Sequence, residues 1–256
     1  MSVKKIIFLN QKGGVGKTTT AVNLGSALAQ LGKKVLLVDL DSQGNLTSAV
    51  SADNRLPGTY EVIVGKCSAK EACQSTSVQN LYVMTANINM AGLNIELVDQ
   101  EMREFFVKKT LDTLGSEWDY ILADCPPSLG LVTINAMCWA QYVIIPMQCE
   151  YFAMEGLNLL MRTVSNIKKS LNPSLKVLGI LFTMYSKRTK LANDVVEDIS
   201  SYFSSLVFST LIPRNVRIAE APSHGLPINV YDMSSSGAKA YQKLAQEVVG
   251  RVAKSE

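Results

Sequence analysis

The chain has 256 residues, of which 47% are hydrophobic and 18% are charged, and its formal net charge at pH 7 is +3. This length and composition are typical of a folded chain with a large apolar core and exclude an intrinsically disordered protein. Its five cysteines and one histidine exclude a disulfide-stapled secreted fold and a multi-histidine metal centre. The mildly basic charge permits binding to nucleic acid or to an anionic membrane but requires neither.

Short β-branched runs alternate along the chain with longer amphipathic stretches. The runs are nearly continuously apolar, which predicts strands of a parallel sheet covered on both faces. We therefore expect an α/β fold with a mostly parallel central sheet, helices on both faces, and a single domain over residues 1–256. The expected strands are 5–9, 35–39, 81–85, 120–124, 142–146, 177–182 and 206–212, and the expected helices are 18–31, 103–114, 131–140, 155–171, 191–203 and 237–253.

Residues 42–101 have the least regular pattern, and we expect loops there. Within them, the spacing of Leu93 and Leu97 predicts a packed helix between Met90 and Val98. The sequence shows no signal-peptide pattern and no apolar run long enough to cross a bilayer, which predicts a cytoplasmic protein.

The segment from Asn10 to Thr20, NQKGGVGKTTT, joins the first expected strand to the first expected helix. Its glycines let backbone N–H groups close around phosphate oxygens, and the helix N-terminus that follows favours negative charge. The Lys17 ammonium is placed to reach the β- and γ-phosphates, and the Thr18 hydroxyl is placed to bind Mg²⁺. We therefore predict a nucleotide phosphate loop made of Lys12, Gly13, Gly14, Val15, Gly16, Lys17, Thr18 and Thr19.

This loop departs from the common pattern G-x-x-x-x-G-K-[ST], because Gln11 stands where that pattern has glycine and a second lysine, Lys12, follows it. In the form K-G-G-x-G-K-T it resembles the deviant Walker A loop of the ParA/MinD family of ATPases. Segments 38–45, 121–127, 148–151, 212–217 and 220–225 also match, so the resemblance runs from about residue 3 to residue 250. It is closest to the short chromosomal, Soj-like ParA proteins, which usually have proline where Ser42 stands. The resemblance implies a P-loop NTPase-type fold and an ATPase that uses ATP and Mg²⁺.

Three aspartates, Asp39, Asp41 and Asp124, lie at the ends of expected strands, where open parallel sheets bind ligands. A buried carboxylate needs a partner, and Mg²⁺ would supply one to Asp124; capping of the next turn is the alternative. By resemblance, Asp41 positions or activates the attacking water and joins Thr18 and Asp124 at the metal site. Also by resemblance, Lys12 is catalytic, because it reaches across a homodimer to the partner's nucleotide.

The resemblance also assigns contacts around the base, the ribose and DNA. Pro213 and Asn215 would contact adenine, with an ordinary strand-exit turn and helix cap as the alternative, and Glu150 would lie near the partner's ribose. Arg188 lies in the cation-rich segment 185–190. The alternative interpretation of this segment is an ordinary solvated surface. By resemblance Arg188 and Arg217 contact DNA, whereas Arg214 is an alternative contact of the nucleotide.

The leading function implied by the resemblance is a switch that dimerises on ATP and binds double-stranded DNA non-specifically on the nucleoid. Slow hydrolysis, stimulated by a ParB-type partner, would then drive chromosome or plasmid partitioning. The phosphate loop begins at residue 10, so we expect no helix-turn-helix domain before it and no operator-specific binding.

Two other functions share the same scaffold. A MinD-like membrane switch would use helix 237–253 as an amphipathic anchor. The modest apolar side chains of that helix favour docking on the protein's own sheet, and we expect no stable membrane association. The second is an electron-transfer or biosynthetic relative. The nitrogenase iron-protein type would need cysteines at cluster positions, which neither Cys125 nor Cys149 matches.

Overall fold

The computed structural model describes residues 2–255. These residues form one seven-stranded sheet of order β3-β4-β2-β5-β1-β6-β7, in which the pairing of β3 with β4 is antiparallel and the others are parallel. The predicted α/β class and mostly parallel sheet are therefore confirmed. The strands are β1 (Lys4–Phe8), β2 (Val35–Asp39), β3 (Cys73–Ser75), β4 (Leu81–Met84), β5 (Tyr120–Asp124), β6 (Tyr142–Gln148) and β7 (Lys176–Thr183).

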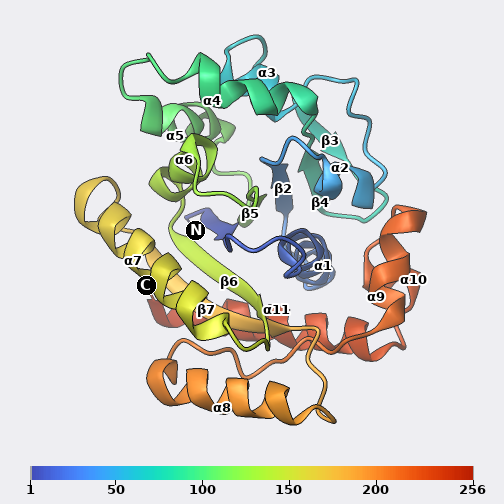
Figure 1. The fold of residues 1–256 in the computed structure, drawn as a ribbon. Helices are drawn as coiled ribbons and strands as arrows, with labels where there is room; N and C mark the ends of the chain where they lie inside the picture. Colours follow the sequence, from blue (N-terminus) through green and yellow to red (C-terminus); the bar gives the residue numbers. More distant parts are fainter. Residues whose placement is uncertain (1, 256) are drawn as a thin grey trace.

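Helices cover both faces of the sheet (Figure 1). Successive residues of a strand point to opposite faces, so Ile6 and Phe8 belong to one apolar cluster and Ile7 belongs to the other. The face of Ile6 carries α1 (Lys17–Gln30), α2 (Asn45–Ala49), α10 (Ile228–Tyr231) and α11 (Ser236–Ser255). The face of Ile7 carries α3 (Thr59–Ile63), α4 (Leu93–Glu96), α5 (Phe106–Leu111), α6 (Leu131–Trp139), α7 (Ala153–Ser170) and α8 (Lys190–Phe203).

The C-terminal helix α11 packs into the core. Its apolar side chains Tyr241, Leu244, Val248 and Val252 are buried in the cluster that also contains α1. The prediction that this helix docks on the protein's own sheet is therefore confirmed. None of the helices in residues 2–255 combines the length and the apolar character needed to cross a bilayer.

The segment 206–212, expected as a strand, is not one; it meets β7 through an isolated bridge. Its backbone bonds to β7 at Leu206, Phe208 and Ile212, and side chains of α11 bind it as well. The Arg251 guanidinium donates to the carbonyl oxygen of Leu206 at 3.0 Å, and the Glu247 carboxylate accepts the N–H of Ser209 at 2.8 Å. Because both partners come from a later helix, the apolar pattern of the segment did not reveal them.

Two further regions differ from the expected elements. The expected helix 103–114 consists of α5 between two 3₁₀ turns, Arg103–Phe105 and Asp112–Leu114. Residues 42–101 hold α2, α3 and the short strand β3 in addition to the expected strand β4. The helix expected near Leu93 is confirmed as the 3₁₀ turn Ile88–Gly92 followed by α4, with Leu93 buried.

Gly179 of β7 lies directly beneath the ring of Phe208. A Cβ at this position would lie 2.4 Å from a ring carbon of Phe208 and 2.8 Å from the carbonyl oxygen of Leu206. The absence of a side chain at Gly179 is what lets the segment 206–212 approach the sheet.

We expect Gly179→Ala to lower the free energy of unfolding by about 1–3 kcal/mol, because the added methyl group overpacks this contact. Denaturant unfolding followed by circular dichroism measures the change. Gly250→Ala in α11 is the matched control, since nothing lies within 4 Å of its added Cβ. The control should raise the free energy of unfolding by about 0.5–1 kcal/mol. A Gly179→Ala protein as stable as the parent would contradict the packing.

Candidate active site

The turn between β1 and α1 is held in place by polar side chains at the ends of two other strands. Gly14 and Gly16 have φ values of 72° and 86°, a left-handed conformation that glycine adopts at little cost. Gln148 donates to the carbonyl oxygen of Gly14 at 2.7 Å, and Thr183 donates to that of Val15 at 2.7 Å. With these carbonyls fixed, the first turn of α1 presents its N–H groups to an anion.

The Lys17 ammonium lies under this turn. The residue is only 7% exposed, and its Nζ donates to the carbonyl oxygen of Lys12 at 3.2 Å. Burial lowers the pKa of Lys17, while the nearby Asp124 and Asp41 carboxylates favour its charged form. Within residues 2–255 Lys17 forms no ion pair, and such a buried cation is suited to a phosphate, since charge-assisted hydrogen bonds are strong in a dry site.

Asp124 is buried at the end of β5, beside Thr18. The Thr18 hydroxyl donates to Oδ2 of Asp124 at 2.5 Å, whereas the buried Oδ1 has no hydrogen-bond partner in the described part of the chain. Burial raises the pKa of Asp124 to about 8, and the neighbouring Asp39 carboxylate adds to the increase. An orphaned carboxylate oxygen beside a threonine hydroxyl fits Mg²⁺, which prefers oxygen ligands and would supply the missing positive charge.

Asp39 and Asp41 have different surroundings. Asp39 is buried at the end of β2, where its Oδ2 accepts the N–H and hydroxyl of Thr47 at 2.9 and 2.7 Å and its Oδ1 accepts the N–H of Asp41 at 3.1 Å. Burial raises the pKa of Asp39 to about 6. Asp41 is partly exposed and lines the same pocket as Lys17 and Thr18. Asp39 therefore fixes the loop, and Asp41 is placed to meet a ligand.

One pocket collects the predicted phosphate residues except Lys12 and Val15, and a second pocket adjoins it. Gly13, Gly14, Gly16, Lys17, Thr18, Thr19 and Asp41 line the first. The second shares Gly16 and Thr19 with it and is also lined by Pro213, Arg214 and Asn215. Asn215 caps α9 (Val216–Glu220), because its Oδ1 accepts the N–H of Arg217 at 2.8 Å. The helix-cap role is thus observed, and a contact of Pro213 and Asn215 with adenine stays a prediction.

Lys12 and Glu150 lie together on the rim of the phosphate loop. They form an ion pair, with 58% and 46% of their side chains exposed. Both line a pocket with Val15, Tyr151 and Phe152, and the two aromatic residues are 78% and 69% exposed. The expected contacts of Lys12 and Glu150 with a partner's nucleotide stay predictions, and they require this ion pair to open.

The two predicted DNA contacts lie outside these pockets. Arg188 is exposed in the loop between β7 and α8, and Arg217 is on α9, where it pairs with Glu220 and Asp232. Their roles stay predictions.

The sequence analysis missed Gln148 and Thr183 as residues that shape the site. Each one is a polar residue that ends a buried, apolar strand. A polar residue at the end of an apolar strand is also the pattern by which the sequence indicated Asp124.

Comparison with known proteins gives consistent matches. A family model described as an AAA domain matches residues 3–177. The chain is 50% identical to the chromosome-partitioning ATPase Soj of Treponema pallidum, over 97% of this chain and 98% of that protein. It is 46% identical to the chromosome partitioning protein ParA of Myxococcus xanthus, over 98% of this chain and 89% of that protein. A solved structure of cobyrinic acid a,c-diamide synthase from Mycobacterium smegmatis, with bound ADP and magnesium, superposes with a TM-score of 0.87 at 35% identity and covers 99% of this chain and 97% of that one.

Lys17→Ala should lower the affinity for ATP by about 100-fold or more, because several charge-assisted hydrogen bonds to phosphate are lost. Titration calorimetry with Mg·ATP measures the affinity. Lys168→Ala, at an exposed position of α7, removes the same charge and should bind ATP like the parent. Parental affinity in the Lys17 variant would show that the phosphate site lies elsewhere.

Proposed function

Because the chain belongs to the ParA family of chromosome-partitioning ATPases, we propose that it is an ATP-driven switch that dimerises on ATP and binds double-stranded DNA without sequence preference. With a ParB-type partner it would partition a chromosome or a plasmid, on the nucleoid, with residues 1–256 acting as one ATPase domain. The observation that carries the proposal is the pocket shared by Lys17, Thr18 and Asp41, in a chain 50% identical to a partitioning ATPase over nearly its whole length.

ATP hydrolysis needs the phosphates to be held, their charge to be offset and a water molecule to be oriented. In this proposal Lys17 and the N–H groups of the loop hold the β- and γ-phosphates. Thr18 and Asp124 would hold Mg²⁺, which when bound stabilises the charge that develops on the phosphate oxygens. Asp41 would orient the attacking water. The hydrogen bonds of Asp39 to Asp41 and Thr47 keep the loop of Asp41 in position.

Three features around the phosphate loop support dimerisation. The Lys12 ammonium lies on the rim of the loop and not under it, so it can meet a group on a second chain. The ion pair that holds it is half exposed, and such pairs contribute little to stability. Tyr151 and Phe152 form an exposed aromatic pair next to Lys12, with ring centroids 5.1 Å apart. Aromatic residues in that position are typical of surfaces that a partner protein covers.

DNA binding would use the exposed cations of the loop after β7. Lys187 and Arg188 are exposed in that loop, and Lys190 is exposed at the first position of α8. One chain presents too few phosphate contacts to bind DNA at physiological salt, whereas a dimer doubles them and makes them act together. ATP could therefore control DNA binding without touching DNA.

A membrane-bound switch is less well supported than a DNA-bound one. An amphipathic membrane anchor needs an exposed apolar face, and the apolar face of α11 is buried against α1 and the sheet.

A metabolic synthase, suggested by the name of one solved structure, is the second candidate. A partitioning switch and a synthase differ in how their ATP hydrolysis is regulated. A partitioning switch hydrolyses ATP slowly and is stimulated by DNA and its partner, whereas a synthase hydrolyses ATP when its small-molecule substrate is present.

Asp41→Ala should still bind ATP and form a long-lived dimer, with hydrolysis reduced about 100-fold or more because the water is no longer oriented. Lys12→Ala should fail earlier, with weak dimerisation, because its proposed contact lies on the other chain. Light scattering during size-exclusion chromatography and a phosphate-release assay measure the two steps separately. Parental hydrolysis in both variants would contradict the switch.

Arg188→Glu should abolish DNA binding in the ATP state and leave ATP binding and dimerisation unchanged. Fluorescence anisotropy with unrelated duplexes, in ATP, in ADP and without nucleotide, tests binding and its lack of sequence preference. For the milder Arg188→Gln, the slope of log affinity against log salt should fall by about 0.9 for each phosphate that the arginine no longer neutralises.

The control for this prediction is Lys168→Glu, which makes the same charge change at an exposed position of α7 and should bind DNA like the parent. No ATP-dependent DNA binding by the parent protein would refute the proposed function. A vesicle sedimentation assay with ATP would then test the membrane alternative.

A further inference from the structure

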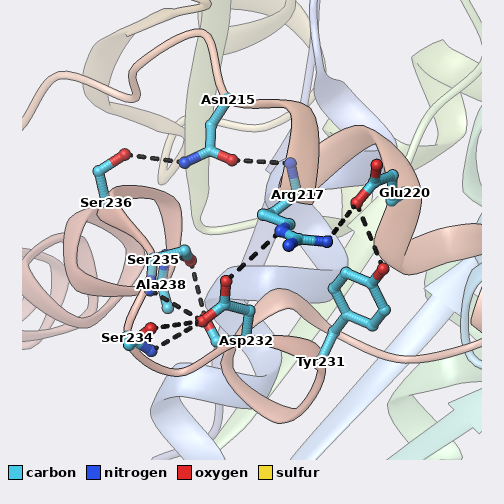
Figure 2. Close-up of polar contacts among 9 residues, drawn as sticks. All are labelled: Asn215, Arg217, Glu220, Tyr231, Asp232, Ser234, Ser235, Ser236 and Ala238. Carbon is cyan, nitrogen blue, oxygen red and sulfur yellow. Dashed lines mark hydrogen bonds and ion pairs between the residues drawn. The ribbon is translucent and has the colours of Figure 1, made fainter.

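Arg217, a predicted DNA contact, is already held by carboxylates of its own chain (Figure 2). Its Nη1 donates to Oε2 of Glu220 at 3.0 Å, and its Nε lies 3.7 Å from Oδ2 of Asp232. The Arg217 side chain is 56% exposed, so a phosphate can approach it from solvent. A phosphate that approaches Arg217 would also lie close to the Glu220 and Asp232 carboxylates.

These two carboxylates are fixed in position by other groups. Oε2 of Glu220 also accepts the hydroxyl of Tyr231 at 3.3 Å. Oδ1 of Asp232 accepts the hydroxyl and the N–H of Ser234 at 2.7 and 3.1 Å. The Ser234 hydroxyl, together with backbone N–H groups, lowers the pKa of Asp232, so this carboxylate is charged at neutral pH. Movement of either carboxylate away from Arg217 would also disturb its hydrogen bonds to Tyr231 or Ser234.

The charges of this cluster do not favour a phosphate as they stand. One guanidinium lies between two carboxylates, which leaves a net negative charge where DNA would bind. Like charges at a contact oppose binding, and a guanidinium that already donates to a carboxylate has fewer donors left for a phosphate. The pairs are exposed, so a phosphate can replace a carboxylate at modest cost.

We propose that Glu220, together with Asp232, competes with DNA phosphate for Arg217 and thereby limits the affinity of the ATP dimer for DNA. This inference rests on the DNA binding proposed above. It assigns to Glu220 the role of an affinity-setting residue that does not itself touch DNA. Weak binding suits a switch that must leave DNA after hydrolysis.

The cluster can be altered without touching the nucleotide pocket directly. Ile218, Ala219 and Pro222 line the pocket beside the phosphate loop, whereas Arg217 and Glu220 lie toward Tyr231 and Asp232 in Figure 2. Glu220→Gln keeps an oxygen that can accept the Tyr231 hydroxyl, so it removes the charge with little change in packing. Because α9 lines the pocket, ATP affinity is measured in parallel.

Glu220→Gln should raise the DNA affinity of the ATP dimer about 3- to 10-fold at low salt, the range expected for one exposed ion pair in each subunit. The slope of log affinity against log salt should steepen, by up to about 0.9 for each additional phosphate that a released Arg217 neutralises. Asp232→Asn, a second variant, should raise the affinity in the same direction. Fluorescence anisotropy with a duplex in ATP, over a salt series, measures both quantities.

Two comparisons separate competition from a general charge effect. Glu197→Gln, at an exposed position of α8, makes the same change in net charge and should raise the affinity less than Glu220→Gln does. In an Arg217→Gln background, whose residual binding is measured at low salt, Glu220→Gln should give no increase in affinity beyond that of Glu197→Gln.

Three results would overturn the inference alone, with the parent still binding DNA. These are an increase in affinity no larger than that of Glu197→Gln, an equal increase in the Arg217→Gln background, or a decrease in affinity, which would mean that the carboxylate orients Arg217 for DNA. If the parent ATP dimer binds no DNA at all, the proposed function fails and the inference fails with it.

Discussion

The burial of opposite charges at the carboxyl edge of the sheet is the constraint on which the site depends. Parallel pairing places Phe8 and Asp39 on either side of Asp124, so that strand ends, carboxylates and the phosphate loop meet at one edge. Lys17 and Asp124 are both buried there, and burial lowers the pKa of Lys17 and raises that of Asp124. Neither group has a full partner within the described residues. A magnesium–nucleotide complex supplies both missing charges at once, an anion for Lys17 and a cation for Asp124.

The charged residues at the rim of the site differ from the buried Lys17 and Asp124, because they are paired and half exposed. Lys12 pairs with Glu150, and Arg217 pairs with Glu220, in both cases through half-exposed ion pairs. Each of these cations is expected to contact a phosphate, of a partner's nucleotide in one case and of DNA in the other. Exposed pairs contribute little free energy, so one anion can be exchanged for another. Buried charged groups surrounded by ion pairs that can exchange their anion suit the switch proposed above, which would bind and release in turn.

The C-terminal third of the chain connects these two parts. Helix α11 packs on α1, which begins at the phosphate loop, and its Arg251 and Glu247 side chains hold the segment 206–212. That segment leads into Pro213 and α9, which border the second pocket. The same helix that could have served as a membrane anchor therefore supports the nucleotide site, because its apolar face is part of the core.

The sequence by itself determined the features that depend on neighbouring residues. The glycines, Lys17 and Thr18 form one continuous loop, so their spacing predicted a phosphate site, and apolar runs predicted the parallel strands because both faces of such strands are buried. Only the tertiary structure showed that Gln148 and Thr183 hold the loop, that side chains of α11 bind the backbone of 206–212, and that carboxylates pair with Lys12 and Arg217. The contacts of Gln148 and Thr183 with the loop, of α11 with 206–212, and of Lys12 with Glu150 all join residues that are far apart in the chain. The Arg217–Glu220 pair is local, but an exposed ion pair leaves no periodic pattern in the sequence, because its free energy is too small to require one.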